Sequence, residues 1–170
     1  MAGSGLALRV VAGVIVAFAA IQLIPYGRNH TNPPVTGEPK WNNAQTRDLS
    51  KRACFDCHSN ETTWPWYSHV APVSWLVQHD VDSGRRHLNF SEWNRPQRHA
   101  KDAAEQVRKG DMPPWYFLPT HPEARLSETE RNQLIEGLTT TMPAAGNISP
   151  HAGAAIAAGP VPAMLRQPKL

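Results

Sequence analysis

Apolar residues form one continuous run near the N-terminus and a helical periodicity in the middle of the chain. The run covers residues 10–24, and Arg9 alone separates it from the apolar residues that begin at Leu6. From Leu6 the segment approaches the ~20 residues that an α-helix needs to cross a bilayer. We therefore expect residues 1–26 to form a signal anchor and transmembrane helix.

A cleaved signal peptide is the alternative interpretation of this segment. Residues 17–19, Ala-Phe-Ala, offer a small-residue cleavage site of the usual kind. The apolar character nevertheless continues through Ile21, Leu23 and Ile24, which a cleaved segment does not need. This continuation favours an anchor that is retained.

Two polar or low-complexity segments flank the middle of the chain. Residues 27–40 are polar and contain Pro33-Pro34, so we expect a linker. Residues 143–170 are rich in Ala, Gly and Pro without sustained periodicity, which predicts a disordered tail. A folded domain is left over residues 41–142. All six tryptophans lie between Trp41 and Trp115 and mark it as the part with a core.

The periodicity within this domain predicts helices. We expect them over residues 41–55, with Asn42 or Asn43 as the cap, over 73–87, and over 97–109, ended by Gly110. The prolines in residues 60–72 and 112–122 predict loops there.

Another helix should begin where Ser127 and Glu130 form a capping box. Its inner face would be Leu134, Ile135 and Leu138. No segment alternates with period two, so the fold class is mainly α.

Charge adds little to this picture. The formal net charge is +3, but all 14 acidic residues and all except three of the 17 basic residues lie between Arg28 and Glu136. That stretch is therefore neutral, and the excess comes from Arg9, Arg166 and Lys169. No basic stripe suggests binding to nucleic acid.

The chemistry of the chain is concentrated in Cys54-Phe55-Asp56-Cys57-His58, which contains both cysteines. Thiols three residues apart on a helical turn share a face and can add to the two vinyl groups of a haem. The histidine that follows can then be the proximal iron ligand. The motif predicts one covalently bound haem c per chain, held by Cys54, Cys57 and His58.

Other uses of two cysteines fit less well. A thioredoxin-type disulfide normally follows a strand in an α/β pattern, which is absent here. A structural zinc site needs four ligands, and no second CxxC or HxxxH pair is present. The apolar N-terminus favours haem, because c-type haem is attached outside the cytoplasm.

The other side of the iron is less constrained by the sequence. Met112 lies between Gly110-Asp111 and Pro113-Pro114, a stiff loop suited to presenting one side chain, so it is the expected distal ligand. Met142, His69 and His121 are the alternatives.

The surroundings of the haem can also be anticipated. We expect the other ring nitrogen of His58 to bond a backbone carbonyl in the following loop, stiffened by Pro65 or Pro72. Aromatic residues near the motif and near Met112 should wall the haem: Trp64, Trp66, Tyr67, Trp115 and Tyr116.

Residues 54–93, beginning CFDCHSNETTWPWYSH, and residues 110–134, beginning GDMPPWYFLPTHPEARLSE, resemble the small bacterial haem-binding domain family. The similarity covers about residues 15–140. Members of that family carry a single CxxCH and usually an N-terminal membrane segment. The resemblance implies a cytochrome-c-like helical haem domain, with Cys54, Cys57 and His58 as the haem site and Met112 in a Met-Pro block. It does not supply a physiological reaction.

The sequence therefore predicts a membrane-anchored, monohaem c-type electron carrier rather than an enzyme, with its haem domain on the periplasmic side. Secretion to the periplasm after signal cleavage is the alternative location. A peroxidase-like haem enzyme and a haem-based sensor are the alternative functions. The redox partner is unknown, and no nucleic acid is expected.

Overall fold

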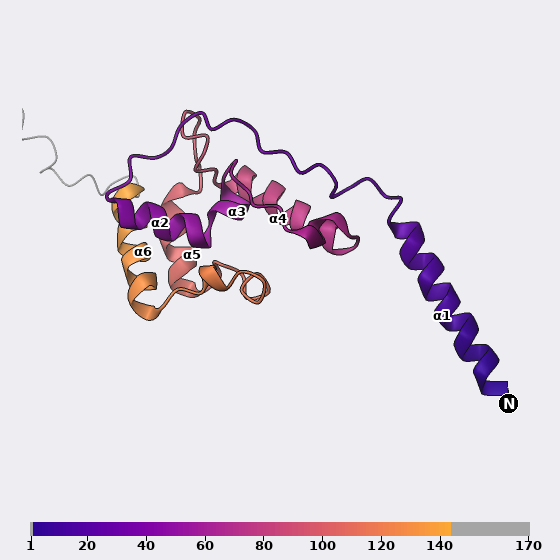
Figure 1. Cartoon of the computed structure of the whole chain (residues 1–170). Helices are drawn as coiled ribbons and strands as arrows, with labels where there is room; N and C mark the ends of the chain where they lie inside the picture. The colour runs from indigo at the N-terminus through magenta and orange to yellow at the C-terminus, as the bar shows by residue number, and fades with distance from the viewer. Residues whose placement is uncertain (1, 144–170) are drawn as a thin grey trace, which may run out of the picture.

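The computed structural model describes residues 2–143, and helices dominate that part of the chain (Figure 1). In chain order they are α1 (Ala2–Ile21), α2 (Ala44–Ala53), α3 (Phe55–His58), the 3₁₀ turn η1 (Trp66–His69), α4 (Val73–His87), η2 (Ala100–Asp102), α5 (Ala103–Lys109), η3 (Pro122–Ala124) and α6 (Glu128–Thr141). Across residues 2–143 the only β pairing is an isolated bridge between Gly37 and Glu92. The mainly α fold class is confirmed.

The N-terminal helix α1 projects away from the other helices (Figure 1). It ends at Ile21, and turns follow where the apolar run continues to Ile24. Within the part of the chain that the structure describes, no helix is long and apolar enough to span a membrane. The expected transmembrane helix is therefore not supported.

Helices α2, α5 and α6 enclose the hydrophobic core beside α3 (Figure 1). Leu134 and Leu138 of α6 are almost fully buried, as expected, and Ile135 packs at the edge of the core. Helices α2 and α6 approach so closely that a Cβ on Gly137 would lie 2.0 Å from Oγ1 of Thr46. A glycine is therefore needed at this crossing.

The boundaries of the helices follow local hydrogen bonds. Helix α2 begins at Ala44 rather than at residue 41, because the side chain of Asn43 accepts a hydrogen bond from Thr46 N at 2.8 Å. The predicted helix over 73–87 matches α4. The capping box of α6 is also present, with Ser127 N donating to Glu130 Oε2 at 2.8 Å.

The helix predicted from residue 97 begins later. The side chain of Gln97 accepts a hydrogen bond from Asn89 N and donates one to Glu92 O, both at 2.9 Å. These two hydrogen bonds stabilise the preceding loop, and residue 97 does not begin a helix. Helical structure begins as η2 at Ala100, and α5 ends at Lys109 with Gly110 as its C-cap, whose φ is 79°.

Residues 27–40, expected as a linker, lie across the helices as an extended strap (Figure 1). Thr36 N donates to Ser91 O at 2.8 Å, and the side chain of Asn32 donates to Thr62 O at 2.9 Å. Arg85 of α4 donates to Thr31 O at 2.9 Å. The strap thus joins segments that follow the CxxCH motif. The predicted tail, from residue 144 onward, lies outside the described residues.

Candidate functional site

The CxxCH motif occupies the single turn of α3, directly after a break in the helical path. Cys54 ends α2 and precedes α3, with φ −131° and ψ −33°. Its carbonyl accepts hydrogen bonds from Cys57 N at 3.2 Å and His58 N at 2.9 Å. This turn keeps the two thiols and the imidazole on one short element, as the spacing predicts.

Helix α4 fixes the imidazole of His58. Its Nδ1 lies 3.1 Å from Gly84 O and 3.0 Å from Leu88 O. Both oxygens belong to carbonyls and only accept hydrogen bonds, so Nδ1 carries the proton and Nε2 keeps a free lone pair. The expected carbonyl partner is thus supplied by the end of α4 and not by the loop containing Pro65 and Pro72.

The contact between α3 and α4 depends on Gly84. A Cβ at this position would lie 2.3 Å from the carbonyl oxygen of Cys57, closer than any real contact. The missing side chain lets α4 approach the CxxCH turn closely enough for its carbonyls to reach His58. In the sequence, Gly84 lies in the last turn of the predicted helix over 73–87, where a glycine would be expected only to lower the helix propensity.

A cavity of about 490 Å³ opens beside this turn. Cys54, Cys57 and His58 line it from one side, and Met112 lines it from a segment far away in the sequence. Its apolar walls come from the core and include Leu88, Phe90, Val107 and Leu138. The volume falls within the ~300–1,000 Å³ of ordinary ligand and cofactor sites.

Burial controls the protonation of the three residues in the motif. It raises the pKa of both the Cys54 and the Cys57 thiol to about 12. It lowers the pKa of His58, against the opposing effect of the two backbone carbonyls. At neutral pH the site therefore holds two thiols and a neutral imidazole, and neutral imidazole is the form that binds a metal ion. The thiols are not the exposed, low-pKa kind found in disulfide exchange.

Met112 borders the cavity from the loop between α5 and η3, and the residue is 37% exposed. Gln106 O accepts hydrogen bonds from Asp111 N and Met112 N at 3.0 and 3.3 Å, which fixes the start of the loop. Met142, the alternative ligand, is 6% exposed and belongs to the hydrophobic core. The structure thus brings Met112, and not Met142, to the cavity that contains the CxxCH motif.

Most of the aromatic residues expected to wall the haem lie elsewhere. Trp66 and Trp115 are 79% and 80% exposed. Trp64 stacks on His30 of the strap, with ring centroids 4.5 Å apart. Of the five expected residues, only Tyr116 lines the large cavity. The expectation was wrong because closeness in sequence to the motif does not decide which way a loop side chain faces.

Several polar residues of the cavity wall were missed by sequence reasoning. His79 and His87 lie on α4, and His99 lies just before η2, whereas the expected alternatives His69 and His121 do not line this cavity. Ser83 lies between the two α4 histidines, so the three positions repeat every four residues along one helical face. That spacing is the signal in the sequence that could have found them. Asp80 borders the cavity as well.

The comparison with protein families decides the kind of domain. Residues 16–140 match the family described as haem-binding domain. The chain belongs to the haem-binding domain family. No curated protein and no solved structure gives a significant match to it.

The residues around the cavity fit the group that the family binds. An imidazole with a free Nε2 suits haem iron, and a methionine thioether on another part of the wall is a second ligand type found in cytochromes. The apolar walls suit a porphyrin, and two protonated thiols lie beside the imidazole. Haem binding is therefore consistent with both the family and the donors that the cavity presents.

Proposed function

We propose that this haem-binding domain is a monohaem c-type cytochrome that carries single electrons. Cys54 and Cys57 would hold the haem covalently through thioether bonds, and His58 would be the proximal ligand of its iron. Met112 would be the distal ligand. The observation that carries this proposal is that all four residues border one cavity, although Met112 is more than fifty positions away from the motif.

Electron transfer is the role that these ligands favour. Bound haem would supply a one-electron ferric/ferrous couple, and a methionine opposite a histidine raises its potential. His58 is held by two carbonyls, so its ring keeps one orientation in both oxidation states. With His58 and Met112 both bound, the iron would have no open position for a substrate, which suits a carrier better than an enzyme.

The proposed covalent attachment also implies a location. Haem c is attached outside the cytoplasm, and the apolar N-terminal helix α1 is the segment that would direct export. We place the haem domain on the periplasmic side. Cell fractionation distinguishes a domain held at the membrane from one released after cleavage, and recovery in the cytoplasm would contradict the export.

An absorption spectrum combined with a pyridine haemochrome spectrum tests the proposal directly. The protein should be produced in a strain with c-type haem attachment machinery. We expect covalent haem after denaturation and a low-spin spectrum with a sulfur-to-iron charge-transfer band in the ferric state. Haem that is extracted by acidified solvent would contradict covalent attachment.

A peroxidase-like enzyme is the second candidate, because the cavity wall contains groups able to move protons. His79, Asp80, His87 and His99 all border the cavity. Such an enzyme needs an open or displaceable distal position next to an acid–base group. High-spin ferric iron together with turnover of hydrogen peroxide by the unmodified protein would favour this candidate over the carrier.

A further inference from the structure

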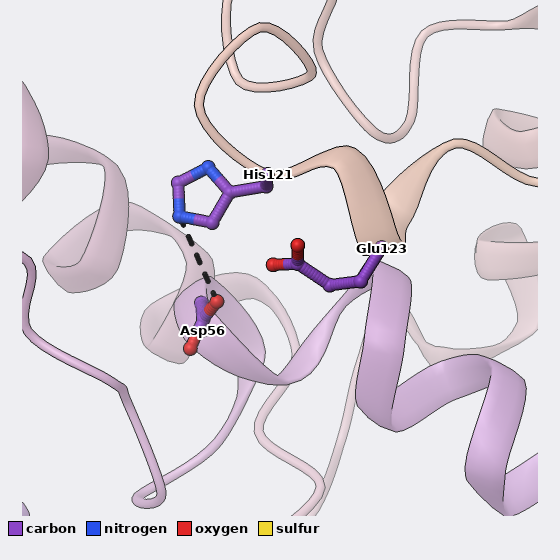
Figure 2. A group of neighbouring side chains, drawn as sticks. All are labelled: Asp56, His121 and Glu123. Atoms are coloured by element: carbon purple, nitrogen blue, oxygen red, sulfur yellow. Dashed lines mark ion pairs between the residues drawn. The ribbon is translucent and has the colours of Figure 1, made fainter.

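Three potential metal ligands meet outside the haem cavity. Asp56 lies in α3, His121 ends the loop that follows Met112, and Glu123 belongs to η3 (Figure 2). One oxygen or nitrogen atom from each lies within 4.8 Å of the others. The group therefore joins the CxxCH turn to the segment before α6.

The imidazole of His121 is already held in the orientation of a metal ligand. Its Nδ1 lies 3.0 Å from Phe117 O and 3.1 Å from Thr120 Oγ1. The carbonyl only accepts hydrogen bonds and also accepts one from the Thr120 hydroxyl, so we assign the proton to Nδ1. The ring stacks on Phe117 with centroids 3.6 Å apart, and the side chain is 14% exposed. Nε2 keeps its lone pair and lies 3.9 Å from Oδ2 of Asp56 (Figure 2). Metal-binding histidines commonly bond a backbone carbonyl through the other ring nitrogen in this way.

Apart from the contact with His121, the two carboxylates have no basic partner among the described residues. Oδ1 of Asp56 accepts a hydrogen bond from Thr63 N at 2.9 Å, which leaves Oδ2 on the side of His121. Within residues 2–143, neither Asp56 nor Glu123 forms an ion pair with a lysine or arginine. Arg52 reaches the backbone oxygen of Glu123, but its charge is paired with Glu130 at 2.6 Å. Two negative charges close together favour a cation between them.

There is also space for a water molecule beside these side chains. A separate cavity of about 40 Å³ is bordered by Asp56 and His121. A volume of ~10–15 Å³ is enough for one water molecule. An ion held by the three side chains could therefore keep a bound water on this side.

We propose that Asp56, His121 and Glu123 bind a divalent first-row transition-metal ion, as a site separate from the haem. Two ligand atoms that each lie about 2.1 Å from zinc are at most ~4.2 Å apart, so the 3.9 Å between His121 and Asp56 already fits. Glu123 is exposed and free to close the remaining distance. One imidazole and two carboxylates suit such ions better than magnesium, which keeps most of its water.

The ion would connect the two halves of the haem site. Asp56 stands between Cys54 and Cys57, and His121 stacks on Phe117, which lines the haem cavity. A bound ion would therefore hold the loop that carries Met112 against the CxxCH turn.

Isothermal titration of the full, haem-loaded chain with Zn²⁺, after chelator treatment, tests the site. We expect one zinc per chain and no comparable heat with Mg²⁺. Glu123→Gln should weaken zinc binding by at least ~10-fold, and His121→Asn should abolish it. Glu136→Gln removes another exposed carboxylate, from α6, and should leave the affinity unchanged.

The haem absorption spectrum of each variant shows whether the domain is still folded. Because Glu123 is exposed, Glu123→Gln should keep the wild-type spectrum even if His121→Asn does not. The proposal is overturned if the wild type binds no zinc, if Mg²⁺ binds equally well, or if Glu123→Gln binds zinc as tightly as the wild type and the Glu136→Gln control.

Discussion

The two sides of the proposed haem cavity are built in different ways. On the proximal side, α4 approaches Cys57 closely at Gly84, and His58 Nδ1 is held by two carbonyls. On the distal side, Met112 comes from a loop, is 37% exposed, and depends on hydrogen bonds from the loop backbone to Gln106. The comparison teaches that the protein fixes one proposed ligand by helix packing and leaves the other proposed ligand on a loop, where fewer packing contacts restrain it.

Removing a thiol is the strongest test of the proximal side. Cys57→Ser should abolish the wild-type two-bond attachment, because a hydroxyl does not add to a haem vinyl group. Haem staining of a denaturing gel and a pyridine haemochrome spectrum measure the loss. Ser83→Ala, also in the cavity wall, should keep the wild-type stain and haemochrome spectrum. A Cys57→Ser variant with the haemochrome spectrum of the wild type would contradict the proposed attachment.

Removing the methionine tests the distal side. Met112→Ala should open the iron to carbon monoxide and lower the reduction potential by on the order of 0.1 V, a fraction of the ~0.8 V range that axial ligands span. Potentiometry and carbon monoxide titration measure both effects, while the covalent haem should remain.

Met142→Leu is the matched control, because Met142 is buried in the core and similar in volume to leucine. It should leave the potential unchanged. If Met142→Leu shifts the potential and Met112→Ala does not, the assignment of the distal ligand is wrong.

Filling the contact between α3 and α4 tests how rigid the proximal side is. Gly84→Ala places a Cβ against Cys57 O and should reduce the free energy of unfolding by roughly 1–3 kcal/mol, or more if α4 cannot shift. Urea unfolding measures the change. Gly13→Ala in α1 meets nothing within 4 Å and should leave the unfolding of the haem domain unaltered. Equal stability of both variants would show that the close contact is unimportant.

Glu130 lies in the first turn of α6, which follows the segment that carries Met112. The stability that its hydrogen bonds contribute should depend on pH. The hydrogen bond from Arg52, with those from Ser127, lowers the pKa of Glu130 from 4.5 to about 2. The group therefore contributes stability above pH 4.5, and the contribution is lost as the pH falls towards 2. Because Glu130 is solvent-accessible, the effect should be small.

Glu130→Gln should make the unfolding free energy less dependent on pH between about 4.5 and 2. Denaturant unfolding at several pH values measures this dependence. Glu136→Gln should retain the wild-type profile, and a Glu130→Gln profile identical to the wild type would remove the proposed role.

The sequence predicted the parts of the molecule that local chemistry controls. Ser127 and Glu130 predicted the start of α6, and Gly110 predicted the end of α5, because the hydrogen bonds of a cap join residues only a few positions apart. The tertiary contacts could not be predicted from the sequence in the same way. Neither the role of Gly84 beneath Cys57 nor that of Gln97 in the loop could be anticipated, since each depends on a partner that only folding brings close. The exposure of Trp66 and Trp115 could not be predicted either, because the path of a loop decides which way its side chains face.

The strap also has a consequence for the order of folding. Thr36 and Gly37 bond Ser91, and Gly37 also bonds Trp93, so the strap is synthesised long before its partners. Contacts this far apart in sequence form slowly, because a long loop must close first. During synthesis the CxxCH segment would therefore emerge before the strap can cross the domain. In this interval Thr62, Arg85 and Ser91 would lack their partners in the strap, so the segments that follow the CxxCH turn would reach their final packing only after the strap has closed.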